Sequence, residues 1–280
     1  MRIAEYVSAR SLDEAIAILA ADGSARALAG GNSLLVEPSR GRLQNAKLVD
    51  LGRIAGLAGI QSEDGGLRIG AMTPLAAIAA DKTVAQQYPV LAEAVNLIGD
   101  AQVRNRATLG GNLAEGEPGA DLPAVMIALG AQVHVQGSKG SRAVSAEEVA
   151  AGALAQGELI TGVSLPRPAP RTGAAYEKFK HPATLYAICG VAASVTLGAN
   201  GVDRCVVAVV GATEAPTRLR GVEAALQGKG SGPSEVAAAA KQSGEGASFR
   251  GDHFASPEYR RHLTGVLAQR ALAKAIERAG

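Results

Sequence analysis

Two glycine-bearing stretches decide the interpretation of this chain: AGGNSLL at residues 29–35 and TLGGNLAEGEPGADLP at residues 108–123. Glycine lacks a Cβ and permits positive φ, so consecutive backbone N–H groups can turn toward one point and hold an anion. Either stretch alone favours an ordinary tight turn, since 35 of the 280 residues are glycine. Together they predict two opposed cradles for a pyrophosphate, termed here the first cradle (29–34) and the second cradle (108–112).

Four longer segments carry a resemblance to a known family: AGGNSLL (29–35), IGAMTPLAAI (69–78), RNRATLGGNLAEGEPGADLPAVMIALGA (104–131) and YEKFKHPATLYAICGVAA (176–193). They resemble the FAD-binding medium subunit of the molybdenum hydroxylases, which include carbon monoxide dehydrogenase and xanthine dehydrogenase. The resemblance continues through SPEYRRHLTGVLAQRAL at 256–272 and spans essentially the whole chain. It implies bound FAD, with molybdopterin and [2Fe–2S] clusters on partner subunits.

The usual dinucleotide motifs are absent from the sequence. No G-x-G-x-x-G opens a helix after a strand, and no G-x-x-x-x-G-K-[ST] occurs, so the two cradles must hold the nucleotide. A hydrogen bond to a charged acceptor contributes about 1.5–3 kcal/mol net, so several can hold FAD without a covalent bond. The predicted donors are the N–H groups of residues 29–34, the side chains of Asn32 and Ser33, and the opposing set Thr108, Gly110, Gly111 and Asn112.

Several further residues are predicted to contact the cofactor. The resemblance places Ile160 along the flavin and Lys178 near the cofactor, where a cation stabilises the reduced ring. Tyr186 is a candidate to flank the isoalloxazine, because its flat amphipathic ring packs against an aromatic edge or face. The complete set of predicted FAD contacts is Leu28, Ala29, Gly30, Gly31, Asn32, Ser33, Leu34, Thr108, Gly110, Gly111, Asn112, Asp121, Ile160, Lys178 and Tyr186.

Three of these predictions have structural alternatives. By resemblance, Asp121 binds a ribose or ribityl hydroxyl, but it could equally cap the following helix. Lys178 could be an exposed strand lysine, and Tyr186 a tyrosine of the core. Many relatives also carry a second basic residue and an acid in the segment that reads KHPATL at 180–185 here. This chain departs from that pattern, which leaves the polar contacts to the isoalloxazine open.

Composition excludes several classes of function. The net charge of +2, with only 3% aromatic residues and no Trp, gives no basis for nucleic-acid binding. Two cysteines, Cys189 and Cys205, are too few for an iron–sulfur or structural zinc site, and both lie in apolar runs typical of a core. The four histidines lack metal-ligand spacing, and no nucleophile or general base is predicted. Acidic residues in the first 20 argue against an export signal, so a cytoplasmic protein is expected.

The first 170 residues predict two α+β lobes. Ser11 begins an S-x-x-E capping box, and the strands predicted at 27–29 and 47–51 complete a β-α-β unit around the first cradle. Thr73 is predicted to cap a helix that has Pro74 at its first position. The other predicted elements here are a strand at 66–71, a helix at 91–98, a short helix after Asp121, and strands at 132–135 and 158–165.

The pattern of the sequence changes after the prolines at 166, 168 and 170, which mark the predicted domain boundary. The apolar segment 185–202 is broken by glycines, which favours two strands and a turn over a membrane span. Ser256 and Pro257 open a long final helix. The other predictions are antiparallel strands at 176–179, 186–197 and 202–210 and helices near 223–226 and 234–242.

These elements predict an α+β fold in two domains. A two-lobed FAD-binding domain at 1–170, with lobes at about 1–56 and 57–170, is expected to be of the PCMH or vanillyl-alcohol-oxidase type by resemblance. A C-terminal α+β domain at 171–280 should pack an antiparallel sheet on helices.

The predicted function is electron transfer by FAD within a larger enzyme. By resemblance, electrons come from a [2Fe–2S] small subunit, a molybdopterin large subunit oxidises the substrate, and the assembly is a dimer of heterotrimers. The substrate and the final acceptor are not encoded in any visible motif. Two alternatives stay open: a self-contained FAD oxidase or reductase, and a nucleotide-binding assembly subunit without catalysis.

Overall fold

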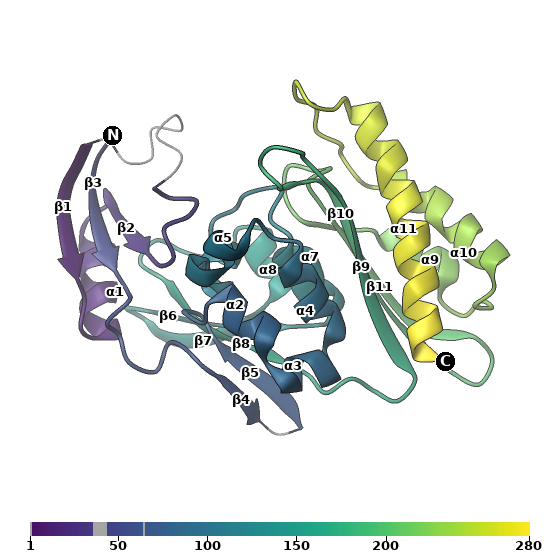
Figure 1. Cartoon of the computed structure of the whole chain (residues 1–280), viewed down its shortest axis with the longest axis horizontal. Coiled ribbons are helices and arrows are strands. Elements are labelled where there is room, and N and C mark those ends of the chain that lie inside the picture. The colour runs from purple at the N-terminus through teal and green to yellow at the C-terminus, as the bar shows by residue number, and fades with distance from the viewer. Residues whose placement is uncertain (1, 36–43, 64) are drawn as a thin grey trace.

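The computed structural model describes residues 2–35, 44–63 and 65–280, which form three β-sheets with helices between and beside them (Figure 1). The molecule is elongated, with the first sheet at one end and the C-terminal helix at the other. The fold is of the predicted α+β class.

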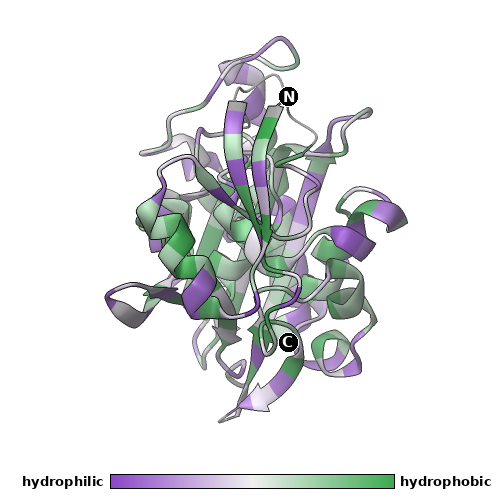
Figure 2. Cartoon of the chain, turned by 90° about the vertical axis from the view of Figure 1, so that its left-hand side faces the viewer, coloured by the Kyte–Doolittle hydropathy of each residue, from purple (hydrophilic) through white to green (hydrophobic). Residues whose placement is uncertain are grey.

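The first sheet is the predicted β-α-β unit. Its strands are parallel and lie in the order β1 (Arg2–Ser8), β3 (Gln44–Asp50), β2 (Ala25–Leu28), and α1 (Leu12–Ala21) connects β1 to β2. Ala15, Ile16 and Leu19 of α1 pack on the sheet because their spacing places them on one helical face. Strands β1 and β3 carry both hydrophilic and hydrophobic residues (Figure 2), and the buried ones, such as Leu48 and Val49, lie on β3, the central strand of the sheet.

The second sheet is antiparallel and is covered by short helices. Its strands lie in the order β4 (Ile60–Glu63), β5 (Gly66–Gly70), β8 (Leu159–Leu165), β6 (Gln132–Gly137), β7 (Gly140–Ser145). The helices are α2 (Leu75–Ala80), α3 (Lys82–Gln87), α4 (Pro89–Asn96), α5 (Ala101–Arg106), α6 (Leu109–Ala114), α7 (Leu122–Ala128) and α8 (Ala146–Ala150). Tyr88 is fully buried between them, and its hydroxyl donates to the Pro166 carbonyl at 3.0 Å.

Two local predictions about helix starts are corrected. Thr73 does not cap α2: its hydroxyl bonds to the backbone of Gly59, and Pro74 is the N-cap residue. A complete capping box forms instead at α8, where the Ser145 hydroxyl accepts from the Glu148 N–H and the Glu148 carboxylate accepts from the Ser145 N–H. At α1 the Ser11 side chain does cap the helix, as predicted, but the predicted box does not close, because the Glu14 carboxylate accepts from the Arg10 N–H and not from that of Ser11.

The third sheet is antiparallel in the order β12 (Thr217–Arg218), β11 (Val202–Val210), β10 (Ala187–Leu197), β9 (Thr172–Lys180). Both of its faces are buried. Alternate residues such as Val191 and Val207 face the C-terminal helices, whereas Ala192 and Ala208 face the core shared with α7. The covering elements are α9 (Arg220–Leu226), α10 (Pro233–Ala240), a 3-10 turn (Lys241–Gly244) and α11 (Pro257–Ala279).

Burial on both faces accounts for the long apolar segment at 185–202. It forms β10 and the turn to β11, as predicted, and no helix among the described residues is long and apolar enough to span a membrane.

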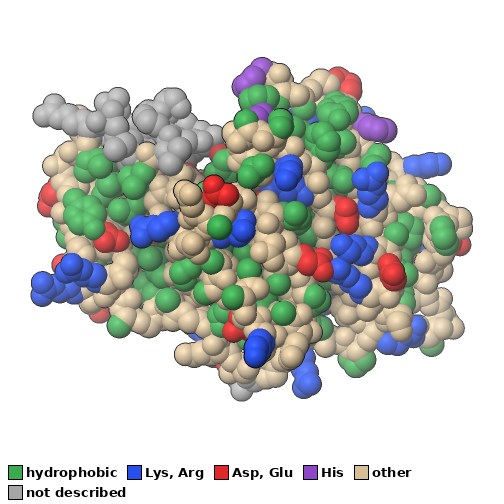
Figure 3. All heavy atoms as spheres, in the orientation of Figure 1, with side chains coloured by type: hydrophobic (Ala, Val, Ile, Leu, Met, Phe, Trp, Pro, Cys, Tyr) green, Lys and Arg blue, Asp and Glu red, His purple; other side chains and the backbone are tan. Residues whose placement is uncertain are grey.

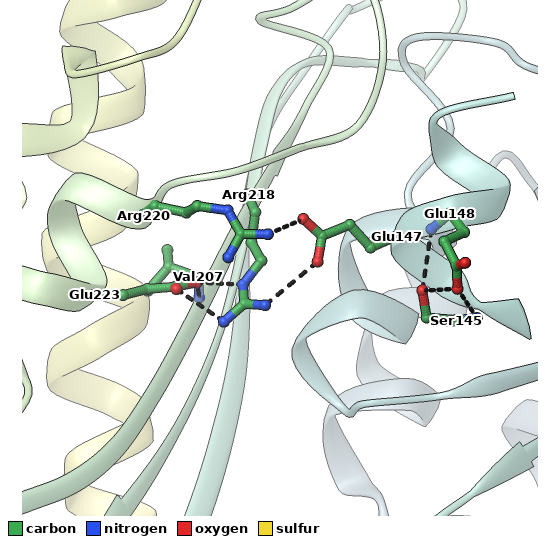
Figure 4. Close-up of polar contacts among 7 residues, drawn as sticks. All are labelled: Ser145, Glu147, Glu148, Val207, Arg218, Arg220 and Glu223. Carbon is green, nitrogen blue, oxygen red and sulfur yellow. Dashed lines mark hydrogen bonds and ion pairs between the residues drawn. The ribbon is translucent and has the colours of Figure 1, made fainter.

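An ionic network joins α8 to the third sheet (Figure 4). The Arg218 guanidinium lies between two carboxylates, donating to Glu223 at 2.8 and 2.9 Å and to Glu147 at 3.3 Å. Arg220 also donates to Glu147. Glu223 is buried and accepts from the Val207 N–H at 2.9 Å, so one end of the network is part of the core.

Candidate functional site

The two cradles line one cavity of about 540 Å³, a size typical of ligand sites. Eleven of the predicted contacts lie on its wall: Ala29, Gly30, Gly31, Asn32, Ser33, Leu34, Thr108, Gly110, Gly111, Asn112 and Ile160. Leu28, Asp121, Lys178 and Tyr186 lie outside the wall. The wall also contains residues that the sequence reasoning missed: the charged Arg26 and Glu115, and the apolar Ala27, Leu51, Ala71, Met72, Ala107, Ala114 and Leu159.

The cradles are held together by direct contacts between distant parts of the chain. The Asn32 side-chain amide donates to the Val103 carbonyl at 2.9 Å. A Cβ on Gly30 would lie 2.2 Å from the Arg106 carbonyl oxygen, so no other residue fits there without moving the backbone. A Cβ on Gly111 would lie 3.7 Å from the Ala29 Cβ. The cavity is therefore a seam between the first sheet and the helices of the second.

The first cradle presents open backbone donors. Gly31 has φ +79°, and the Leu35 N–H donates to the Gly31 carbonyl at 3.0 Å, which closes one helical turn. The first N–H groups of such a turn have no partner within it. Among the residues that the structure describes, the N–H groups of Asn32 and Ser33 meet no acceptor. They are suited to binding an anion.

The second cradle has a different chemistry from the one predicted. Three of its N–H groups are already bonded: Gly110 donates to the Ala71 carbonyl at 2.8 Å, Gly111 to the Thr108 hydroxyl at 3.2 Å, and Asn112 to the Thr108 carbonyl at 3.0 Å. Gly110 is required by packing, since its Cβ would lie 2.7 Å from the Ala71 Cβ. The second cradle therefore offers mainly side-chain groups to a ligand. The Asn112 Oδ1 is buried and has no partner among the described residues.

Asp121 and Lys178 bind one another outside the cavity wall. Lys178 Nζ lies 2.8 Å from Asp121 Oδ2, the Tyr176 hydroxyl donates to Asp121 Oδ1 at 2.5 Å, and both charged side chains are at most 3% exposed. The two structural alternatives are both wrong: the Asp121 side chain makes no capping bond, and Lys178 is not exposed. Burial raises the pKa of Asp121, while the Lys178 ammonium acts in the opposite direction.

Tyr186 lies at the rim of the first cradle. Its hydroxyl is 3.5 Å from the Ser33 Oγ, and the residue is half-buried. It belongs to the turn between β9 and β10 and is followed by Ala187, whose N–H donates to the Gly119 carbonyl at 3.1 Å. The turn therefore contacts both the first cradle and the segment that follows the second.

The two cysteines lie in the core, as predicted. Cys189 and Cys205 are buried and unpaired, and burial raises their pKa to about 11 and about 12. Thiols of that kind are neutral and inert at physiological pH. Within residues 2–35, 44–63 and 65–280, no group of His, Cys, Asp and Glu side chains is placed to hold a metal ion.

The comparisons with known proteins agree with this site. Residues 2–168 match the family described as the FAD binding domain in molybdopterin dehydrogenase, and residues 174–275 match the CO dehydrogenase flavoprotein C-terminal domain. The chain belongs to this flavoprotein family. It is thus a flavoprotein subunit of the molybdenum-containing oxidoreductases, and its family binds FAD.

Relatives match along the full length. The carbon monoxide dehydrogenase medium chain of Hydrogenophaga pseudoflava is 35% identical over 96% of this chain and 95% of its own. The alpha subunit of the 6-hydroxypseudooxynicotine dehydrogenase complex of Paenarthrobacter nicotinovorans is 34% identical over 98% and 95%. A solved carbon monoxide dehydrogenase from Hydrogenophaga pseudoflava superposes with a TM-score of 0.93 at 34% identity, covering 100% of this chain and 99% of the other.

The cavity has features that FAD requires. Open N–H groups at Asn32 and Ser33 suit a pyrophosphate, and the unpartnered Asn112 Oδ1 can accept from a ligand hydroxyl or amine. The apolar residues of the wall suit a flat ring system.

Proposed function

We propose that this chain binds FAD noncovalently across the two cradles and transfers electrons within a molybdopterin-dependent hydroxylase or dehydrogenase. The single observation that supports this most is that both cradles, more than 70 residues apart in sequence, line one cavity with open donors on one side. FAD supplies the redox chemistry when bound. The chain itself binds, orients and tunes the cofactor.

The proposed contacts follow the geometry of the cavity. Backbone N–H groups of the first cradle bind the pyrophosphate, and the Thr108 hydroxyl donates to it from the opposite side. Asn112 Oδ1 accepts from a hydroxyl or amine of the cofactor. Ile160 packs along a ring of the cofactor, and Tyr186 flanks the flavin from the rim. Asp121 and Lys178 satisfy one another, so we assign them to hold the loop after the second cradle, rather than to contact FAD directly.

The proposal extends to organisation and partners. We infer an FAD-binding domain at 1–170 with lobes near 1–56 and 57–170, and a C-terminal domain at 171–280. A [2Fe–2S] subunit delivers electrons from a molybdopterin subunit, in a cytoplasmic dimer of heterotrimers. Relatives named as medium chains or complex subunits support such partners, and two unpaired cysteines are compatible with a reducing compartment.

Two measurements test the cofactor and the partner. Denaturing the purified protein should release a flavin that chromatographs as FAD; a yellow band on the polypeptide, or FMN in solution, contradicts the proposal. Co-expression with the two expected subunits should give a heteromer whose flavin is reduced by substrate. Substrate-driven reduction of FAD in the isolated chain would instead support a self-contained oxidoreductase.

A further inference from the structure

The turn at 181–186, between β9 and β10, is organised by one side chain. His181 Nδ1 accepts from the N–H groups of Ala183 at 3.2 Å and Thr184 at 3.1 Å. The backbone closes the same turn, because the Leu185 N–H donates to the His181 carbonyl and the His181 N–H donates to the Tyr186 carbonyl. The side chain thus does what Asn or Asp does in an Asx turn.

This arrangement fixes the role of one ring nitrogen. Nδ1 accepts both N–H groups and therefore acts as an acceptor in this turn. The ring is 9% exposed and packs edge-on against Phe254, with centroids 4.1 Å apart. Histidine and hydrophobic side chains lie side by side along this edge of the molecule (Figure 3).

One residue of this turn, Leu185, has an unfavourable backbone conformation. Leu185 has φ +61°, a conformation that a bulky residue adopts only when its surroundings impose it. Tyr186 follows directly, and its hydroxyl lies 3.5 Å from Ser33 of the first cradle. The two bonds that His181 accepts therefore lie within the turn that carries Tyr186.

We propose that His181 is a positioning residue for the cofactor site, whose Nδ1 holds the turn that places Tyr186 against the first cradle. This inference rests on the proposed function, since Tyr186 is assigned there as the neighbour of the flavin. It also gives a role to the segment in which the chain departs from the pattern of many relatives.

Two variants distinguish the role of Nδ1 as a hydrogen-bond acceptor from the packing of the His181 ring. His181→Asn keeps an acceptor on the same branch of the side chain, because Asn Oδ1 and His Nδ1 are both bonded to Cγ. His181→Leu keeps bulk against Phe254 but removes the acceptor. Phe254→Ala, at a residue 53% exposed, is the control that removes the packing partner and leaves the acceptor intact.

Hydrogen exchange at Ala183 and Thr184 and the visible circular dichroism of bound FAD are measured in the full-length chain. We expect His181→Leu to lose about tenfold or more in amide protection and to change the flavin spectrum. His181→Asn and Phe254→Ala should match the wild type in both.

Wild-type behaviour of His181→Leu, or equal losses in His181→Asn and His181→Leu, would overturn the inference. Absence of FAD from the wild-type protein would overturn the proposed function instead, and the exchange data would still show whether the acceptor holds the turn.

Discussion

Lys178 donates to Asp121 at 2.8 Å where both side chains are almost completely shielded from water. Removing two charges from water costs several kcal/mol each, so the pair is stable only while both partners and their other bonds are present. Lys178 also donates to the Leu97 carbonyl, and Tyr176 to Asp121. The pair thus ties α7 and the region of α4 to β9.

Breaking this pair should destabilise the protein strongly. Lys178→Met leaves a buried carboxylate without its cation, and we expect a loss of about 3–5 kcal/mol in the free energy of unfolding. The double variant Asp121→Asn/Lys178→Met should lose less than the sum of the single variants, because their effects are coupled. Urea denaturation measures both.

The matched control is Lys274→Met. Lys274 is 40% exposed, its ion pairs with Glu93 and Glu177 are 3.8 and 3.7 Å long, and its loss should cost under about 1 kcal/mol. Equal losses of stability in Lys178→Met and Lys274→Met would show that the buried pair contributes no more than an exposed one.

Gly111→Asp should yield a folded protein that is nearly free of flavin. The new carboxylate would lie in the cavity opposite the first cradle, and its Cβ would be 3.0 Å from the Thr108 Oγ. At an effective dielectric near 20, repulsion from a phosphate at contact is about 4 kcal/mol, or roughly a thousandfold in affinity. The ratio of flavin to protein absorbance checks this.

Gly23→Asp is the control for that substitution. Gly23 lies on an exposed turn outside the cavity wall, and its Cβ would be 3.5 Å from the Gln156 side chain. Full flavin occupancy is expected. Retention of FAD by Gly111→Asp at the same level would place the cofactor elsewhere.

The two carboxylates of the ionic network in Figure 4, Glu223 and Glu147, should contribute differently to the free energy of unfolding. Glu223→Ala orphans the buried Val207 N–H and one side of Arg218, and should cost about 3 kcal/mol. Glu147→Ala removes a carboxylate that is 36% exposed, and should cost under about 1 kcal/mol. Thermal and urea unfolding of the two variants decide this, and the reverse order of effects would contradict it.

Acid should weaken the protein partly through Glu158. The Arg142 hydrogen bond lowers the pKa of Glu158 from 4.5 to about 2. Because the folded-state pKa is lowered, this stabilisation is complete above pH 4.5 and is lost as the pH falls toward 2. Glu158→Gln and Arg142→Leu should both flatten the dependence of stability on pH in that window. An unchanged slope in both would refute the assignment.

Much of the fold could be predicted because its elements carry local signals. Ser11 and Ser256 cap helices by side-chain chemistry that is visible in the sequence, and β10 and β11 are visible as continuous apolar runs that are buried on both faces. Thr73 was misassigned because a tertiary partner, the backbone of Gly59, competes for its hydroxyl. No local pattern reveals such a competitor.

The location of the site could be predicted from the sequence better than the individual contacts within it. Glycine patterns located both cradles, but a glycine required for packing at Gly110 looks the same in sequence as one that frees an amide at Gly31. The charge of Asp121 was visible, whereas its partner Lys178 lies 57 residues away, on a strand that only the folded sheet brings near. Met72 and Leu159 could not be predicted as lining residues of the cavity, because in the sequence they look like ordinary core residues.

The seam between the cradles also sets an order for biosynthesis. The first cradle leaves the ribosome more than 70 residues before Asn112, and the loop after the second cradle is held by N–H groups of Ala187 and Gly211 that are made later still. N-terminal domains generally fold first during synthesis, which proceeds at about 5–20 residues per second. A nascent chain that ends before Gly211 therefore lacks the contacts that hold this loop, and we expect cofactor loading to be completed late in translation or after release.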